Sequence, residues 1–217
     1  MSKKKIVVFD FDGTLANSLP LIGYCFEKSL ANYLKEEVKE EDVFKYSGPT
    51  EKGIIKKIVK PEDFPNAFKK YLEVYNEKHD EYIKEIDVNL INLLTDLKNK
   101  KITVVLATGR GRESTIISFK RLGLNKYFDG IYTGSLVRVN KADSLKKIMK
   151  KYDVTSNDVI YIGDTYADYL EMSKVNIKLL SVLYYNMADE LRLKGVNVEN
   201  LVYSIKELKT KIEEFIK

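Results

Sequence analysis

The chain has 217 residues, of which 44% are hydrophobic and 32% are charged, and its 37 Lys and Arg against 32 Asp and Glu give a net charge of +5. This composition excludes a wholly disordered chain, and no apolar run approaches the roughly 18 residues of a membrane-spanning helix. Cys25 is the only cysteine, which excludes an intramolecular disulfide and a zinc site of several thiolates. We expect a cytoplasmic protein without a signal peptide or a membrane partner.

The positive net charge raises the question of a nucleic-acid partner. Lysine pairs such as Lys146-Lys147 and Lys150-Lys151 alternate with acids and apolar residues along a helical pattern, which is typical of a solvated helix face. No interleaving of aromatic and basic residues indicates a platform on which bases could stack. We therefore expect no nucleic-acid partner, and the sequence leaves open whether the protein is a monomer or a dimer.

Strand and helix patterns alternate along most of the chain. Short β-branched segments predict strands at residues 5–9, 102–107, 130–132, 159–162 and 177–183. Amphipathic stretches predict helices between and after them, at residues 89–99, 113–122, 142–152, 168–174 and 204–216. Near-continuous apolar strands that alternate with amphipathic helices predict an α/β fold, with a Rossmann-like parallel sheet and helices on both faces.

The connection between the first two predicted strands is much longer than a crossover requires, which is about 10 to 12 residues. Helices are expected inside it at residues 18–34, 51–59 and 64–82, with a turn and helix start at 47–50. We predict a small helical cap at residues 17–86, inserted after the first strand of a core formed by residues 1–16 and 87–217. Cys25 and His79 follow the apolar pattern of the cap and are expected to pack in its interior.

Two acids follow the first predicted strand, in the segment Asp10-Phe11-Asp12-Gly13-Thr14. Strand alternation points Asp10 and Asp12 in one direction, where buried carboxylates are costly unless a cation or a proton compensates them. Such oxygen ligands suit Mg²⁺, and Gly13 permits a tight turn and a close approach of the backbone to a phosphate. An ordinary Asp-Gly turn would suffice to explain Asp12 and Gly13 alone.

Polar residues also follow three other predicted strands. This weakens the explanation of Asp12 and Gly13 as a simple Asp-Gly turn. Thr108-Gly109-Arg110 follows the second strand, Asn140-Lys141 opens the helix after the third, and Asp164 and Asp168 follow the fourth. Because the carboxyl ends of parallel strands meet at one edge of a sheet, these side chains can converge on a single crevice.

These segments resemble the four motifs of one family, in the family's order: Asp10-x-Asp12-Gly13-Thr14-Leu15, Thr108, Lys141 and Gly163-Asp164-x-x-x-Asp168. The sequence resembles the haloacid dehalogenase superfamily over essentially its whole length. Within it, the chain is similar to capped enzymes such as phosphoglycolate phosphatase and β-phosphoglucomutase. The resemblance implies a Mg²⁺-dependent phosphatase that hydrolyses a small phosphorylated metabolite through an aspartyl-phosphate intermediate.

The resemblance also implies roles for the acids. Asp10 is expected to be the nucleophile, and Asp12 the general acid that protonates the leaving oxygen and later activates water. Mg²⁺ would be bound by the Asp10 carboxylate, the Asp12 backbone carbonyl and Asp164. Asp168 would orient Lys141 or a metal-bound water.

Five residues are candidates for binding the substrate. The resemblance implies that Thr108 and Lys141 bind the phosphoryl oxygens, and Gly109 offers a backbone amide beside them. Arg110 directly follows and could bind a phosphate in a bidentate way. Lys52 lies where capped relatives present a specificity turn, although an exposed lysine at a helix start would look the same.

The sequence leaves two alternatives to a phosphatase. Asp12 favours phosphate esters, because dehalogenases of the superfamily lack an acid at this position, but sugar phosphomutases of the same capped type retain it. A noncatalytic phosphate-binding regulatory module on this fold is a third possibility, which the complete set of catalytic positions disfavours. Residues 182–186 replace a Gly-rich loop of many relatives, and neither the subfamily nor the substrate follows from the sequence.

Overall fold

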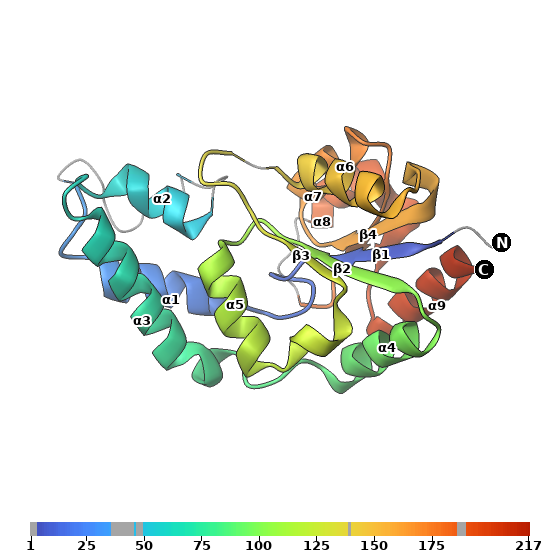
Figure 1. Ribbon diagram of the computed structural model, residues 1–217, viewed down its shortest axis with the longest axis horizontal. Coiled ribbons are helices and arrows are strands. Elements are labelled where there is room, and N and C mark those ends of the chain that lie inside the picture. Colours follow the sequence, from blue (N-terminus) through green and yellow to red (C-terminus); the bar gives the residue numbers. More distant parts are fainter. Residues whose placement is uncertain (1–3, 36–45, 47–49, 139, 186–189) are drawn as a thin grey trace.

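A parallel sheet forms the centre of the protein. The computed structural model describes residues 4–35, 46, 50–138, 140–185 and 190–217. In these residues six parallel strands lie in the order β3-β2-β1-β4-β5-β6 (Figure 1). The strands are β1 (Ile6–Phe9), β2 (Thr103–Ala107), β3 (Gly130–Tyr132), β4 (Val159–Gly163), β5 (Lys178–Val182) and β6 (Leu201–Val202). The predicted α/β fold is confirmed, and β6 is an additional strand that the sequence pattern did not predict.

The strand order reverses direction beside β1. The chain runs outward from β1 to β2 and β3, and then returns to place β4 on the other side of β1. Ile6 to Phe9 are fully buried and pair with residues 103–106 of β2 and 159–162 of β4. A crevice at the carboxyl ends of the strands is expected at such a switch point, which here lies directly after Phe9.

Helices cover both faces of the sheet. The core helices are α4 (Val88–Asn99), α5 (Arg112–Arg121), α6 (Lys141–Tyr152), α7 (Tyr166–Ser173), α8 (Glu190–Asn197) and α9 (Ile205–Ile216). Val7 and Phe9 of β1 pack in one apolar cluster with residues of α4, α5 and α9, whereas Ile6 and Val8 pack in a second cluster with α6 and α7. The two-residue alternation of strand side chains thus supplies a core on each face (Figure 1).

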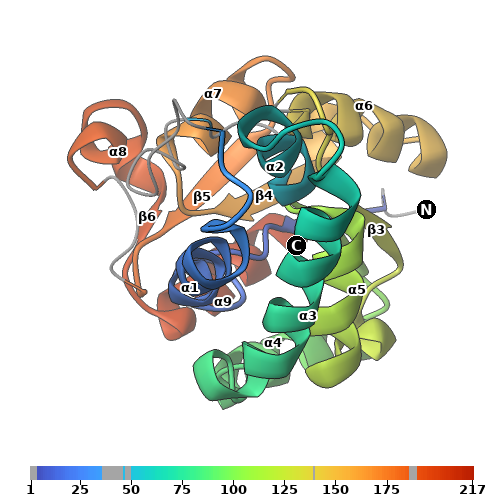
Figure 2. The ribbon, with the colours of Figure 1, turned by 90° about the vertical axis from the view of Figure 1, so that its left-hand side faces the viewer.

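Three inserted helices follow β1: α1 (Leu19–Leu30), α2 (Glu51–Ile58) and α3 (Phe64–Tyr82). Figure 2 shows α3 between α1 and α5, so the insertion packs against the core as well as on itself. The middle of the predicted apolar stripe of α3 is buried, at Ala67, Tyr71 and Tyr75, whereas Tyr82 at its end is exposed. His79 on α3 and Cys25 on α1 are buried as predicted. The predicted turn at 47–49 lies outside the described residues, and the division at residues 17–86 stays a prediction.

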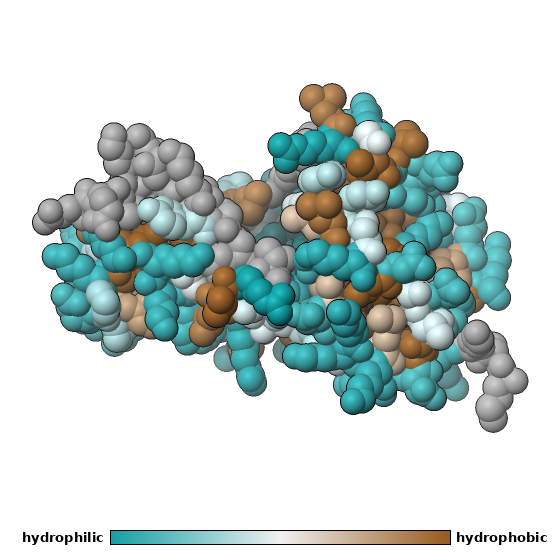
Figure 3. Space-filling model, turned by 90° about the horizontal axis from the view of Figure 1, so that it is seen from above, coloured by the Kyte–Doolittle hydropathy of each residue, from teal (hydrophilic) through white to brown (hydrophobic). Residues whose placement is uncertain are grey.

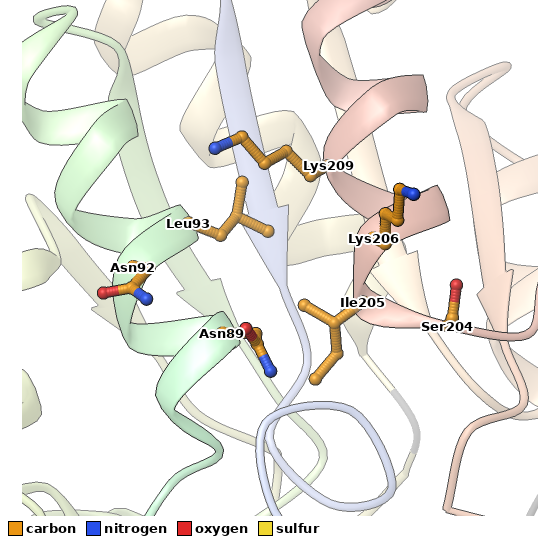
Figure 4. A pocket seen from close by; sticks show the side chains of 7 residues that line it. All are labelled: Asn89, Asn92, Leu93, Ser204, Ile205, Lys206 and Lys209. Atoms are coloured by element: carbon orange, nitrogen blue, oxygen red, sulfur yellow. The ribbon is translucent and has the colours of Figure 1, made fainter.

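The surface of the described residues includes a largely hydrophilic face (Figure 3) and a groove between two core helices. The face seen in Figure 3 is largely hydrophilic, with apolar side chains scattered among polar ones. An open groove of about 470 Å³ lies between Asn89 and Leu93 of α4 and Ile205 and Lys209 of α9 (Figure 4). Lys209 also pairs with Asp96 of α4. Within the described residues, no helix combines the length and apolar character that crossing a membrane requires.

Candidate active site

Four of the predicted residues form one buried group at the carboxyl edge of the sheet. Asp10 directly follows β1, Lys141 is the first residue of α6, and Asp164 and Asp168 follow β4. The backbone N–H of Asp10 donates to the carbonyl of Ile162 at 2.9 Å, which extends the β1–β4 pairing up to the site. We call Asp10, Lys141, Asp164 and Asp168 the strand-end cluster.

The lysine ammonium links two of the three carboxylates. Lys141 Nζ donates hydrogen bonds to Asp10 Oδ2 and to Asp168 Oδ1, and all three side chains are almost fully buried. Burial alone would lower the pKa of Lys141, but the charges of Asp10 and Asp168 outweigh it and raise that pKa above its ordinary value. Lys141 therefore stays protonated and compensates part of the negative charge.

Asp168 has a fixed orientation because it also caps α7. Its Oδ2 accepts hydrogen bonds from the backbone N–H and the hydroxyl of Thr165, at 3.0 and 2.7 Å, and the Thr165 hydroxyl in turn accepts from the Asp168 N–H. This reciprocal capping box leaves Oδ1 directed at Lys141. The contact agrees with the expected orienting role, which stays a prediction.

The cluster carries more negative than positive charge. Burial raises the pKa of Asp164 to about 8, with further increases from the charges of Asp168 and Asp10. Burial also raises the pKa of Asp10 to about 6, although Lys141 opposes the shift. Among the described residues Asp164 Oδ1 is buried without a hydrogen-bond partner. Acids held in this way are costly, and such perturbed groups are typical of functional sites.

The donor set fits a divalent cation. Asp10, Asp164 and Asp168 each offer an oxygen, and these oxygens lie within 4.8 Å of one another. Gly13 has a φ of +69°, and a Cβ on it would lie 2.0 Å from Asp164 Oδ2, so only glycine leaves room for this carboxylate. Carboxylate oxygens, one of them unpartnered, are the chemistry that Mg²⁺ selects. The Asp12 carboxylate is not in this group, and only its backbone carbonyl was predicted as a ligand.

Asp12 lies in the loop that leads to the inserted helices. The loop is closed by a hydrogen bond from the Gly13 N–H to the Ala16 carbonyl at 2.9 Å. The hydroxyl of Ser18, at the start of α1, donates to Asp12 Oδ1, and the Asp12 side chain is 22% exposed. Asp12 is thus the more accessible of the two acids after β1, as a group that exchanges protons with substrate and water should be.

Thr108 and Gly109 lie at the end of β2. The N–H of Thr108 continues the pairing with β3 by donating to the Tyr132 carbonyl at 3.0 Å, and its hydroxyl accepts from the Arg110 N–H at 3.3 Å. A Cβ on Gly109 would lie 3.9 Å from Cε of Lys141, so this residue borders the lysine. Both positions fit the predicted phosphate-binding edge, a role that stays a prediction.

Arg110 lies among side chains of the inserted helices and of the core. Its guanidinium is buried, Nη1 donates to Ser118 Oγ at 3.2 Å, and Nη2 donates to the hydroxyl of Tyr75. Nε lies 3.5 Å from Asp12 Oδ1 and 3.9 Å from Glu51 Oε1. In this structure the guanidinium binds side chains of the protein, because α2 and α3 supply partners that the local sequence does not reveal, and a phosphate contact of Arg110 stays a prediction.

Lys52 joins α2 to α5. Its Nζ pairs with Glu113 Oε1 at 2.9 Å and lies 4.9 Å from the centre of the Phe68 ring. The side chain is partly exposed, so the ion pair is accessible to solvent. This contact accounts for Lys52 without a substrate, and its proposed part in specificity stays a prediction.

Two groups of contacting residues were missed by sequence reasoning. Glu51 accepts hydrogen bonds from the Gly111 N–H and the Ser114 hydroxyl, both at 2.6 Å. Tyr184 and Tyr185 donate to the carbonyls of Thr14 and Leu15, at 2.7 and 3.2 Å, and so support the loop after β1. The sequence offered one signal for each group: Glu51 is an acid at the start of a helix, and the tyrosine pair stands where many relatives have a Gly-rich loop.

The fold and this edge define a hydrolase with the haloacid dehalogenase arrangement of motifs. The family model described as haloacid dehalogenase-like hydrolase matches residues 7–182, and the chain belongs to that family. A pyrophosphatase PpaX from Bacillus mycoides (strain KBAB4) is 26% identical over 184 residues, which are 83% of this chain and 84% of that protein.

Solved structures share the fold over nearly the whole chain. A predicted phosphatase from Clostridium acetobutylicum is 26% identical, with a TM-score of 0.72 over 98% of this chain and all of that one. CbbY from Rhodobacter sphaeroides, solved in complex with phosphate, is 16% identical, with a TM-score of 0.75 over 95% of this chain and 96% of that one. The latter likeness establishes the fold alone.

Proposed function

We propose that the protein is a Mg²⁺-dependent phosphatase that hydrolyses the phosphomonoester of a small metabolite through an aspartyl phosphate on Asp10. The convergence of Asp10, Lys141, Asp164 and Asp168 at one sheet edge carries this proposal. Membership of the hydrolase family and the similarity to a pyrophosphatase and to a phosphatase structure support it. The single cysteine, which is buried and free, is compatible with the reducing cytoplasm that we expect as its location.

Asp10 is the nucleophile in this proposal. One of its oxygens forms a bond to phosphorus while the bond from phosphorus to the leaving oxygen breaks, which divides hydrolysis into two displacements. Its Oδ1 accepts from the Phe11 N–H at 2.7 Å and its Oδ2 contacts Lys141, so the carboxylate has a fixed orientation. The lysine charge reduces the repulsion between the carboxylate and an incoming phosphate.

Asp12 moves the protons. It donates a proton to the leaving oxygen in the first step, and in the second step it accepts one from the water that attacks the phosphorus of the aspartyl phosphate. Ser18 and Arg110 approach the same oxygen, Oδ1. No hydrogen bond to Oδ2 is formed by the part of the chain that the structure describes, so this second oxygen is available to the substrate.

Asp10, Asp164 and the Asp12 backbone carbonyl would hold Mg²⁺. When bound, the ion would offset the negative charges that phosphate and the carboxylates bring together. Thr108, Gly109 and Lys141 would bind the phosphoryl oxygens. The unpartnered Asp164 Oδ1 and the space preserved by Gly13 support this arrangement.

A hydrolysis assay tests the proposal. Aryl phosphates, inorganic pyrophosphate and a panel of metabolite phosphates are incubated with and without Mg²⁺, and released phosphate is measured. We expect Mg²⁺-dependent release by the wild type and none above background by Asp10→Asn. Turnover that survives both the removal of metal and the substitution would refute the mechanism. Isomerisation of a sugar phosphate without phosphate release would instead identify a phosphomutase.

A further inference from the structure

Arg110 lies at the boundary between the inserted helices and the core, and it has partners on both sides. Ser118 of α5 accepts from Nη1 on the core side, and Tyr75 of α3 accepts from Nη2 on the side of the insertion. The guanidinium carbon is 4.5 Å from the ring centre of Phe11 and 5.1 Å from that of Tyr75, so the group is enclosed between two aromatic rings. Figure 2 shows the two helices, α3 and α5, side by side.

The third nitrogen of the guanidinium, Nε, faces two acids. Nε lies 3.5 Å from Asp12 Oδ1 and 3.9 Å from Glu51 Oε1, and it forms no hydrogen bond within the described residues although it is buried. Glu51 itself is fixed by Gly111 and Ser114. Arg110, Asp12, Glu51, Tyr75 and Ser118 are called the arginine network below.

We propose that Arg110 is a positioning residue for Asp12, and that the packing of α2 and α3 against the core sets its position. The inference rests on the proposed function, in which Asp12 is the proton donor. Arg110 and the Ser18 hydroxyl both approach Oδ1, which leaves Oδ2 without a hydrogen bond among the described residues. Arg110 thus acts through Asp12 and does not need to contact the substrate.

The link to the inserted helices follows from the identity of the partners. If α2 and α3 move away from the core, Arg110 loses the Tyr75 hydroxyl and the nearby charge of Glu51. Asp12 is then the remaining acid beside it, and a guanidinium binds a single carboxylate best by bonding both of its oxygens. That pairing would occupy Oδ2. The proton donor is consequently available only when the helices are packed on the core and bulk water is excluded.

The test measures how the rate depends on the leaving group. A general acid matters most for poor leaving groups, so misplacing Asp12 should slow alkyl and unactivated aryl phosphates more than nitrophenyl phosphates. We compare kcat and KM for a graded series of aryl phosphates in the wild type, Asp12→Asn, Arg110→Lys and Tyr75→Phe. The matched control is Tyr71→Phe, because the buried Tyr71 hydroxyl on the same helix has no hydrogen-bond partner among the described residues.

We expect Arg110→Lys to lose about tenfold to a hundredfold in kcat for the poorest leaving group and less than about threefold for the best, because small misplacements of a reacting group are costly. Tyr75→Phe should show a smaller loss with the same trend, and Tyr71→Phe should match the wild type. The inference would be overturned if both Arg110→Lys and Tyr75→Phe lost kcat equally for all the aryl phosphates. It would also be overturned if neither variant lost kcat for any of them. Tyr75→Phe keeps the ring in place, so it decides the matter if Arg110→Lys does not fold.

The Asp12→Asn variant separates this inference from the function on which it rests. If kcat depends more steeply on the leaving group in Asp12→Asn but is as in the wild type in Arg110→Lys and Tyr75→Phe, the positioning role of Arg110 is rejected and the proposed function stands. An unchanged dependence in Asp12→Asn, or a wild type that hydrolyses none of the esters, rejects the proposed function and the inference with it.

Discussion

The strand-end cluster and the arginine network are both buried groups of charges, but they are balanced differently. The cluster has three carboxylates and one ammonium, which pairs with Asp10 and Asp168, and Asp164 Oδ1 has no hydrogen-bond partner among the described residues. In the network one guanidinium faces two carboxylates, and each carboxylate has a further donor of its own. We propose that the cluster receives an external cation and a phosphate, whereas the network mainly binds parts of the protein to each other.

The two groups also differ in how they are built. Residues of the cluster all belong to the core. Asp10 and Asp164 directly follow β1 and β4, so the register of these strands sets their positions, whereas Lys141 and Asp168 lie in the first turns of α6 and α7. The network joins residues of α2 and α3 to residues of the core, so it exists only while the insertion is packed against the sheet. We therefore expect substitutions in the cluster to abolish catalysis, and substitutions in the network to alter the position of Asp12, the proposed general acid.

The largest effect should come from removing the nucleophile. Asp10→Asn should lower kcat by at least about a thousandfold, since the loss of a nucleophile leaves only binding and electrostatic effects. Steady-state release of phosphate from an aryl phosphate measures this. Asp143→Asn, which changes an acid on the exposed side of α6 that pairs with Arg138, serves as the matched control and should retain wild-type activity. Comparable losses in both variants would contradict a special role for Asp10.

Removing the ammonium of the cluster should have the next largest effect. Lys141→Met leaves Asp10 and Asp168 buried without their cation, which should lower the free energy of unfolding by about 3 to 5 kcal/mol at pH 8. Denaturant titration in metal-free buffer measures the change. Lys209→Met breaks an exposed ion pair with Asp96 and should change stability little, since such pairs contribute little. If both variants were equally stable, the cluster would not depend on its lysine as we infer.

Adding a methyl group at Gly13 should have a smaller effect that also reports on the metal site. Gly13 and Gly123 both have positive φ, +69° and +63°, but only the added Cβ at position 13 meets Asp164. Gly123→Ala should cost about 1 kcal/mol from backbone strain. Gly13→Ala should cost more and should reduce the stabilisation that Mg²⁺ gives in thermal unfolding. An equal response of both variants to Mg²⁺ would exclude Gly13 and Asp164 from the metal site.

The smallest effect concerns His79, which is buried on α3 and bonds Ser118 of the arginine network at 3.1 Å. Burial lowers the pKa of His79 below its ordinary value of 6.5, against the effect of Asp80. The unfolded chain therefore binds the proton more readily, and this residue makes the free energy of unfolding fall as the pH drops below about 6.5.

Other groups act in the opposite direction on this pH dependence. The raised pKa values of Asp10 and Asp164, about 6 and about 8, make the folded state bind protons more readily than the unfolded chain, so these acids favour the folded state as the pH falls. The difference in the free energy of unfolding between the wild type and His79→Gln isolates the contribution of the histidine. In denaturant titrations this difference should shrink as the pH is lowered from 7.5 to 5.5, and a constant difference would show that His79 does not titrate as inferred.

The strand-end cluster could be predicted because each of its residues lies just after a strand or at the start of a helix. Apolar β-branched runs located β1 and β4, and their parallel arrangement brings Asp10 and Asp164 to one edge. Lys141 was found from its position at a helix start. The two-residue strand β6 was missed because it is too short to show alternation, and α8 was missed because its apolar pattern is weak.

The direction of Arg110 could not be predicted from its neighbours in the chain. Gly109 borders Lys141 of the strand-end cluster, yet the next side chain points toward Tyr75 and Glu51, which are distant in sequence. A buried guanidinium goes where acceptors and aromatic faces are available, and these come from the tertiary packing of α2 and α3. Sequence patterns report periodicity and local turns, so they located the residue but not its partners.

The covalent state of Asp10 during turnover tests the central claim most directly. The enzyme is mixed with an aryl phosphate and Mg²⁺, quenched in acid within the first turnovers, digested and analysed by mass spectrometry with fragmentation. The account predicts a phosphoryl group on Asp10, which disappears when Mg²⁺ is omitted and does not form in Asp10→Asn. Turnover with no adduct on Asp10, or with the adduct on another residue, would contradict it.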